Sequence, residues 1–589
     1  MGKLTEIRQS YFGKGMTNLL RAKNFDYAQL VGNFDIYSDP TKMRPNPDFA
    51  ADSIESLTVA ESKLCKFLAG PSAADGGTEQ YALGVVSGTT KAKIFRKTVA
   101  SSDAWAAATT GEDSNTGRNE NFFVLYPRTV LWGARGGVRL WSYQIGSNTF
   151  DTSGAASHAL TYTQIFQGLV HSKDDILYIP YYSAAGSFIA KYNGTTWTDT
   201  ALTLPASMIP ICISEFGNYL AIACKQKNIQ SGPSIVFLWD RDSSLTTLSE
   251  SINWGPESLE MIEELDGVLV GVSVFANTST ESFISRPKLV FKAYTGGTPQ
   301  AKQFLEIPLT SSTVNSNQLP TVNLVTGGLG TGVAIDRQKI NNRVFFPLSC
   351  EINNVQYDAV WAITRLSDGS LSVSIDRLYN NDTAVTSGEP KGLFKFGDYM
   401  TVAFEDNSVY KANDTISGAA TYTAQTSVYE TLIMGEPYLK FKLNSVGVMT
   451  EPLPGGGTVV VKYKKDAETA FTTIFSHTTV TAGSFVTGTR YTILSVGTTD
   501  FTLVGASANT VGVEFDATGA GSGTGVVART PLFHEANKIE GAGNLPEFRE
   551  LTLRIESTGG AVVIGYWAQA EQVSKGLVNR ILQGIRGWL

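Results

Sequence analysis

Residues Asp175–Trp197 read DILYIPYYSAAGSFIAKYNGTTW, a pattern of apolar runs separated by turn residues. Two apolar runs, Asp175–Ile179 and Ser187–Tyr192, are each the length of one strand and are separated by small and polar residues. Asn193-Gly194 is a turn signal, and Thr196-Trp197 opens a more polar strand after it. The stretch therefore predicts consecutive antiparallel strands joined by turns.

The same plan recurs along residues 59–435, about every 40–60 residues, in about seven units. This period is typical of β-propeller blades, in which stacking buries the faces of each four-stranded sheet against its neighbours. An array of β-sandwiches is the alternative. The other strand groups of this kind are Asn121–Tyr126 with Thr129–Gly133 and Val138–Gln144, Tyr219–Cys224 with Ser234–Asp240, Val268–Val274 with Lys288–Tyr294, Arg343–Leu348 with Ala359–Arg365, and Tyr399–Phe404 with Ser408–Lys411.

Further segments flank the repeats. Residues 1–58 are polar, contain several X-Pro pairs, and are predicted to form an N-terminal arm that packs on another surface. Residues 436–480 and 530–570 carry alternating strands such as Phe548–Glu556 and predict a small antiparallel sandwich. Residues 481–529, rich in glycine and threonine, are predicted to be a β module inserted into that sandwich. The expected fold class is all-β: a propeller of about seven irregular blades, a sandwich with an inserted small β domain, and a C-terminal amphipathic helix.

The last stretch, residues 571–589, has the clearest helical pattern. Apolar side chains recur at helical spacing, while Lys575, Arg580 and Arg586 take other positions on the wheel. We expect this helix to dock on another protein surface and, with the N-terminal arm, to make subunit contacts. A helix on a membrane surface and a frayed tail are the alternatives. The candidate contact residues are Val573, Leu577, Ile581, Ile585 and Trp588.

Composition restricts the function classes. Charged residues are 17% of the chain and its formal net charge is −7, so no general nucleic-acid footprint is expected. No run of about 18 apolar residues is present, and the first residues, MGKLTEIRQSYFGKGMTNLL, lack the apolar core of a secretory signal. The four cysteines are widely spread, which indicates folding in a reducing cytoplasm.

No catalytic residue, cofactor or metal ion is predicted, because the known motifs for them are not found. His158 and His171 flank one blade connection and meet in one interpretation, but separate, satisfied histidines are favoured. Cys212 and Cys224 are expected on adjacent strands as buried free thiols. The run Gly327–Gly332 lacks the lysine and the helix of a phosphate-binding loop.

Two sets of residues keep a carbohydrate function open. Glu263-Glu264 is a carboxylate pair of the kind a glycosidase needs, although a solvated strand end is favoured. Trp132, Trp141 and Trp197 are candidates for stacking on sugars, although a place in the blade cores is favoured.

Within the predicted insertion the sequence becomes recognisable. It resembles a β module that recurs in virion proteins of tailed bacteriophages. The resemblance covers less than about a tenth of the chain. It rests on the runs Gly488–Ile493 (GTRYTI), Ser495–Thr502 (SVGTTDFT), Gly505–Gly512 (GASANTVG) and Phe515–Gly525 (FDATGAGSGTG).

A weaker resemblance extends over the whole chain. An arm with Phe12–Met16 (FGKGM), a central propeller, and a sandwich ending in Phe548–Glu556, Gly559-Gly560 and Tyr566 is similar to the tail nozzle, or tail-tube hub, of short-tailed phages. This resemblance implies a non-enzymatic virion protein, assembled in the host cytoplasm without membrane insertion. It implies a homo-hexameric ring below the head-to-tail adaptor, which anchors tail fibres or tip proteins and through which viral DNA passes without specific binding.

Two other functions stay open beside this one. The first is a receptor-binding propeller of the same tail, which would hold glycans through its blade loops. The second is a propeller glycosidase that would cleave host polysaccharide. The net negative charge favours the conduit, because DNA slides past a surface that offers few phosphate contacts.

Overall fold

The computed structural model divides into two compact units. The propeller unit comprises Phe49–Gly369 and Asp382–Gly418, and the sandwich unit comprises Met1–Asp48, Ser370–Asn381 and Ala419–Leu589. The structure describes residues 4–17, 28–47, 49–51, 66–71, 78–85, 92–98, 105–107, 118–135, 139–151, 157–227, 233–242, 248–275, 288–309, 336–352, 355–378, 390–396, 399–404, 409–413, 422, 426–529, 533–539 and 543–574.

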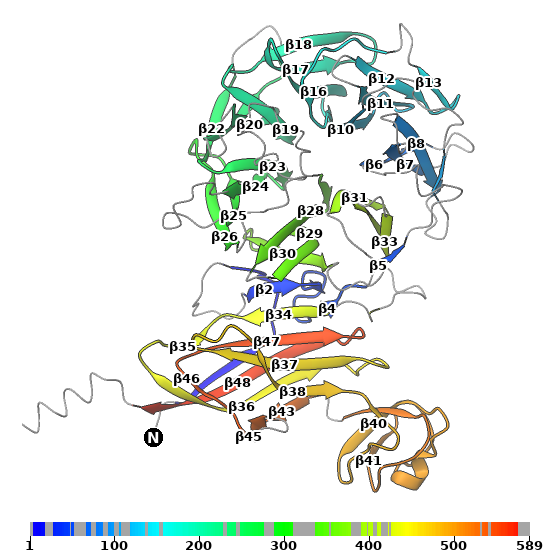
Figure 1. Cartoon of the computed structure of the whole chain (residues 1–589), viewed down its shortest axis with the longest axis vertical. Coiled ribbons are helices and arrows are strands. Elements are labelled where there is room, and N and C mark those ends of the chain that lie inside the picture. Colours follow the sequence, from blue (N-terminus) through cyan, green and yellow to red (C-terminus); the bar gives the residue numbers. More distant parts are fainter. Residues whose placement is uncertain are drawn as a thin grey trace, which may run out of the picture. The chain divides into compact units, whose positions relative to one another are not determined.

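Seven antiparallel blades make up the propeller unit (Figure 1). In chain order, the first blade contains β6 (Lys66–Pro71), β7 (Thr78–Val85), β8 (Ala92–Thr98) and β9 (Ala106–Ala107). The second contains β10 (Arg118–Leu125), β11 (Val130–Arg135), β12 (Arg139–Gln144) and β13 (Thr149–Asp151). The third contains β14 (Gln164–Ile165), β15 (Leu169–His171), β16 (Ile176–Ser183), β17 (Gly186–Tyr192) and β18 (Trp197–Thr203).

The other four blades follow the same plan. The fourth blade contains β19 (Met208–Phe216), β20 (Tyr219–Gln226), β21 (Ser234–Trp239) and β22 (Glu250–Gly255), and the fifth contains β23 (Ser258–Leu265), β24 (Val268–Phe275), β25 (Lys288–Tyr294) and β26 (Lys302–Pro308). The sixth contains β27 (Gln338–Ile340), β28 (Arg343–Ile352) and β29 (Val355–Arg365). The seventh contains β31 (Pro390–Phe396), β32 (Tyr399–Phe404) and β33 (Val409–Asn413), together with β5 (Phe49–Ala51).

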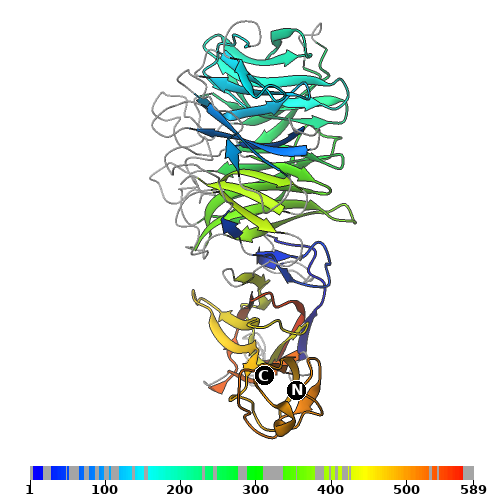
Figure 2. The same ribbon diagram turned by 90° about the vertical axis from the view of Figure 1, so that its right-hand side faces the viewer.

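The blades close into a ring. Consecutive blades touch through their inner strands, from β6 and β10 around to β31, and β31 contacts β6 of the first blade again. Strand β5 pairs antiparallel with β33, with Ala50 opposite Lys411, so a strand from before the first blade completes the last one. Figure 2 shows the ring edge-on, with the blades stacked along it. The predicted propeller of about seven blades is confirmed.

The propeller core lies between blades. One cluster joins Trp132 of the second blade to Ile179 of the third, and another joins Tyr178 of the third to Trp239 of the fourth. A third packs Trp254 of the fourth blade against Leu259 of the fifth. Each sheet is therefore apolar on both faces, as expected of blades that are stabilised by their neighbours.

The sandwich unit contains two packed sheets. In one sheet the order is β1 (Leu4–Gln9), β48 (Val563–Ser574), β36 (Lys440–Thr450) and β43 (Phe533–Ala536), with β46 (Glu547–Phe548) also on β36. In the other the order is β30 (Leu371–Leu378), β2 (Ala28–Gly32), β34 (Ser427–Thr431), β47 (Glu550–Thr558), β37 (Thr458–Lys465) and β38 (Thr472–Thr478), with β35 (Met434–Gly435) on β47. Two short hairpins, β3 (Phe34–Asp35) with β4 (Arg44–Pro45) and β44 (Lys538–Ile539) with β45 (Gly543–Asn544), belong to the same unit.

The N-terminal residues 1–58 do not form a separate arm in their described part. Strand β1 is an edge strand of the first sheet and β2 lies inside the second, while β5 belongs to the propeller. Phe12 is fully buried and packs against Tyr429 and Tyr566, with ring centroids 5.5 and 6.4 Å away. The prediction of an arm is therefore wrong here, because backbone pairing and aromatic packing make the described residues before Phe49 part of the sandwich, and pairing with β33 makes β5 part of the propeller.

The inserted module, predicted at residues 481–529, has a sheet of its own. Its order is β39 (Val480–Thr481), β42 (Val526–Arg529), β40 (Arg490–Ser495) and β41 (Glu514–Asp516), with the 3₁₀ turn η3 (Phe501–Val504). Phe485, Tyr491, Phe501 and Phe515 form its buried core. The module thus buries these four aromatic side chains within itself.

Within the described part of the chain, no helix is long and apolar enough to cross a bilayer.

Candidate interaction surface

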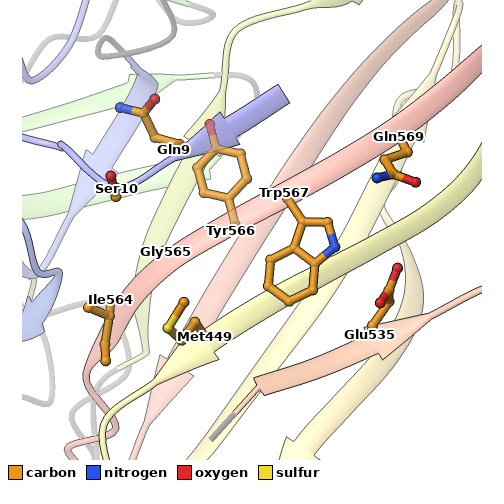
Figure 3. Close-up of a pocket in the computed structure, with 9 residues that line it drawn as sticks. All are labelled: Gln9, Ser10, Met449, Glu535, Ile564, Gly565, Tyr566, Trp567 and Gln569. Atoms are coloured by element: carbon orange, nitrogen blue, oxygen red, sulfur yellow. The ribbon is translucent and has the colours of Figure 1, made fainter. Parts of the chain in front are cut away.

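A groove of about 490 Å³ lies on the outer face of the sandwich sheet that contains β48 (Figure 3). It spans from the end of β1 across β48 and β36 to β43. The side chains that matter most for its character are Gln9, Met449, Glu535, Ile564, Trp567 and Gln569.

The floor of the groove is the indole of Trp567. Successive strand residues point to opposite faces, so Tyr566 enters the core between the sheets and is 3% exposed, while Trp567 faces outward. Trp567 pairs directly with Gly447 on β36, and a Cβ on this glycine would lie 2.1 Å from the indole Cζ2. The ring therefore lies across the glycine backbone, which leaves room for it on the sheet surface.

The rim combines apolar and polar groups. Met449 is 44% exposed and adds apolar surface beside the indole of Trp567. Glu535 on β43 stands opposite Gly447 in the register and is exposed, so its carboxylate borders the indole. Gln569 accepts a hydrogen bond from Ser445 at 3.4 Å. Such a surface suits an apolar peptide face that carries cationic side chains.

The predicted contact residues lie at or beyond the end of β48. Val573 is on this strand and is 49% exposed, so the predicted helix does not begin at Glu571. The reason is pairing on both sides, since Glu571 is opposite Leu4 of β1 and Lys442 of β36. The other four, Leu577, Ile581, Ile585 and Trp588, lie outside the described residues.

The two histidines near the blade connection have separate partners. The Nε2 atom of His158 is 2.6 Å from Asp199 Oδ1, and its ring stacks on Trp197. His171 is fully buried and accepts a hydrogen bond from Arg241 at 3.0 Å. Burial and the neighbouring Arg241 lower the pKa of His171. The favoured interpretation as separate, satisfied histidines agrees with these contacts.

The carboxylate pair is held in ion pairs at the end of β23. Glu263 accepts from Arg337 Nε at 2.6 Å and from Ser214 at 2.9 Å, and Glu264 lies 2.5 Å from Lys339. Arg337 also donates to the Ile213 carbonyl at 2.6 Å. These contacts connect three consecutive blades, so the pair has a structural role here.

The three tryptophans lie in packed surroundings. Trp132 and Trp141 are 4% and 2% exposed. Trp197 stacks on His158 and on Tyr192, with centroids 4.4 and 4.3 Å away and nearly parallel rings. At these centroid distances the rings of His158 and Tyr192 would overlap if both lay on one face of the Trp197 indole. They therefore cover its two faces. Trp197 is therefore not available to stack on a sugar.

The free thiols also match their expected places. Cys212 and Cys224 are buried on the paired strands β19 and β20, and burial raises the pKa of the Cys212 thiol to about 11. Neither thiol is suited to act as a nucleophile. Cys65 and the run Gly327–Gly332 lie outside the described residues. Where the structure describes the chain, no cluster of three or more histidine, cysteine or acidic side chains is arranged to hold a metal ion.

Sequence reasoning missed the groove. The adjacent aromatic residues Tyr566 and Trp567 were the available signal, because in a strand one of the two must face away from the core. Which of the two faces outward depends on the register with β36, and this register is not visible in the sequence.

Comparisons with known proteins give the following. No family model matches the chain, and no curated protein matches it. Among solved structures, a catalytically inactive virginiamycin B lyase from Staphylococcus aureus with quinupristin is 12% identical, over 62% of this chain and 99% of that one, with a TM-score of 0.36. The N-terminal domain of Nup159 is 9% identical (62% and 95% covered, TM-score 0.37). BamB from Moraxella catarrhalis is 10% identical (64% and 99% covered, TM-score 0.34). Likenesses of this size carry no inference about what the chain does.

Proposed function

We propose that this chain is a structural protein of a bacteriophage tail, which forms a homo-hexameric ring that extends the DNA channel below the head-to-tail adaptor and anchors further tail parts. The observation that carries the proposal is the inserted module. Its sequence resembles a β module that recurs in phage virion proteins, and it folds around its own aromatic core between β38 and β43 of the sandwich. A module of that kind can be carried by many virion proteins, since insertions at loop tips are well tolerated.

The receptor-binding propeller is the second candidate function, because the resemblance to phage proteins fits it equally. Its candidate stacking residues are Trp132 and Trp141, which are buried, and Trp197, whose two ring faces are both covered. The glycosidase is the third, and its carboxylate pair is engaged with Arg337 and Lys339. We therefore place the conduit first.

Electron microscopy of single particles tests the proposal. The full chain would be imaged at several concentrations, and in disrupted virions labelled with antibodies against it. A six-fold ring with an open axial channel is the expected result. Monomers or trimers at the periphery of the tail would instead favour the receptor-binding propeller over the conduit. Turnover of host polysaccharide by the purified chain would replace both by the enzyme.

A further inference from the structure

We propose that residues 575–589 fold back from the end of β48 and dock in the groove of the same chain. The occupant of the groove is then the chain's own C-terminal segment. This assignment moves the apolar side chains of the segment from a subunit contact to the sandwich, and it does not depend on the hexameric ring.

The first argument is the match of apolar faces. The groove exposes Trp567 and Met449, which otherwise remain in contact with water at the outer face of the sheet. Burying apolar surface of this kind is favourable, because it removes that surface from water. In the segment, Leu577, Ile581, Ile585 and Trp588 recur at i, i+4, i+8 and i+11, which places them on one face of a helix.

The second argument is reach. Strand β48 ends at Ser574, seven residues from Trp567, which is about 23 Å along a strand. A helix from Leu577 to Leu589 is about 20 Å long. Lys575 and Gly576 are left to reverse the chain direction, and glycine suits such a turn. Trp588 would then lie level with the groove.

The third argument is charge. The segment carries Lys575, Arg580 and Arg586 and no acidic side chain. On the outer face of the sheet, Glu535 and Glu571 are exposed; Glu571 is directly opposite Lys442 of β36, whereas the residue opposite Glu535 is the uncharged Gly447. Glu571 lies on β48 between Ser574 and Trp567. Glu535 lies on β43, across β36 from Trp567. A basic segment that follows β48 back from Ser574 therefore meets the Glu535 carboxylate at the groove, whereas Glu571 already faces Lys442.

Direct attachment favours the chain's own segment over one from a second copy. A two-residue connection keeps the segment at millimolar effective concentration near the groove, far above the concentration of other copies in a dilute solution. The surface and its occupant are thus continuous in one chain.

Cross-linking tests the assignment in the full chain. The variant pairs Met449→Cys with Trp588→Cys, and Cys65→Ser removes the thiol outside the described residues; the described native thiols are buried. With a short bismaleimide, we expect a monomer-sized product with these two positions joined. It should form at least about tenfold faster than in a control with Val511→Cys, an exposed position on the inserted module, in place of Met449→Cys.

A second measurement avoids cysteine variants. Peroxide converts an accessible methionine into its sulfoxide. Oxidation of Met449, followed by mass spectrometry, should be about threefold or more slower in the full chain than in a chain that ends at Ser574. Met434, which is buried, is the internal reference.

The outcomes separate the alternatives. A cross-linked dimer would show a second copy's segment in the groove and would overturn the proposal. Equal oxidation rates in the two chains, or no cross-link at a rate above the control, would also overturn it. A missing ring in electron microscopy together with an intact intramolecular cross-link would remove the proposed function alone.

Discussion

The indole of Trp567 lies across the backbone of Gly447, its directly paired residue on β36. The second propeller blade repeats this relationship, since Gly133 pairs directly with Trp141 and a Cβ there would lie 1.9 Å from the indole Cζ2. In both units a glycine makes room on one strand for an indole from the next. In the blade the indole is buried, whereas on the sandwich it forms the floor of a groove.

Replacing this glycine should therefore damage both the sandwich and the groove. In Gly447→Ala the new methyl group overlaps the indole, so Trp567 must leave its position or the strands must separate. We expect a loss of about 1–3 kcal/mol in the free energy of unfolding. Calorimetry of the full chain measures the shift of the sandwich transition. The control is Gly455→Ala, where a Cβ meets no atom of the described residues within 4 Å. An equal effect at both positions would show that the indole does not need the glycine.

Arg241 joins the third and fourth blades. It donates to Asp174 at 2.8 Å, to His171 at 3.0 Å and to the Asn218 carbonyl, and its side chain is only 13% exposed. Arg241→Met leaves these acceptors without their donor, and we expect the propeller to lose about 1–3 kcal/mol of stability. Hydrogen exchange should increase first at the amides of residues 171–176.

An exposed ion pair provides the contrast. Arg490 contacts Glu514 on the inserted module with a side chain that is 52% exposed. Arg490→Met should change stability by no more than about 0.5 kcal/mol, because water screens such a pair. If both arginine variants shifted the melting of their units equally, burial would not be the reason for the effect at Arg241.

The inserted module should fold alone. Residues 479–530 expressed by themselves are expected to give a dispersed NMR spectrum, because the aromatic core is internal to them. The ring centroids of Phe515 and Phe501 are 5.6 Å apart, and Phe515 is 3% exposed. Phe515→Ala should therefore lower the free energy of unfolding by about 3–5 kcal/mol, which is enough to unfold a domain of this size. Leu503→Ala is the control, since Leu503 is 78% exposed. A disordered spectrum of the unmodified module would show that its fold depends on the sandwich.

The parts of the fold that were predicted from sequence are those with local patterns. The strand pairs Asp175–Ile179 with Ser187–Tyr192, and the glycine-rich insertion, are defined by residues close together in the chain. Strand β5, by contrast, pairs with β33 more than 350 residues later, and β1 pairs with β48 at the other end of the sequence. Pairings of this range leave no periodic signal in either partner, so they could not be predicted.

The error at the start of the C-terminal helix has a physical cause. Val573 fits the helical spacing toward Leu577, and it also fits the alternation Trp567, Gln569, Glu571, Val573 of a strand. Pairing decides between these patterns in favour of the strand: β1 and β36 both pair with it as far as Glu571, and the pairing with β36 continues to Ser574. The groove was missed for the same reason, because the side of the sheet that Trp567 faces depends on that register.

The last prediction concerns pH. His477 and His534 lie 5.8 Å apart beside the inserted module, and Arg529 lies 3.3 Å from His534. Burial, followed by the neighbouring cations, lowers the pKa of each histidine to about 4. In the unfolded state these histidines have a pKa near 6.5, so below that pH the unfolded chain binds more protons than the folded one. Their contribution to the free energy of unfolding is therefore complete above about pH 6.5 and is lost as the pH decreases toward about 4. One such histidine accounts for a loss on the order of 3 kcal/mol across this window.

The variant His477→Leu isolates this effect from the titration of carboxylates. Among the residues that the structure describes, neither ring nitrogen of His477 has a hydrogen-bond partner, so an apolar side chain of similar size should preserve stability at pH 7.5 or increase it by about 1 kcal/mol. Between pH 6.5 and 4.5 the sandwich should then lose less stability than in the unchanged chain. Urea unfolding at four pH values gives both slopes, and His158→Leu serves as the comparison because that histidine contacts Asp199 in the propeller. Identical slopes for the sandwich with and without His477 would mean that the buried pair does not control its response to acid.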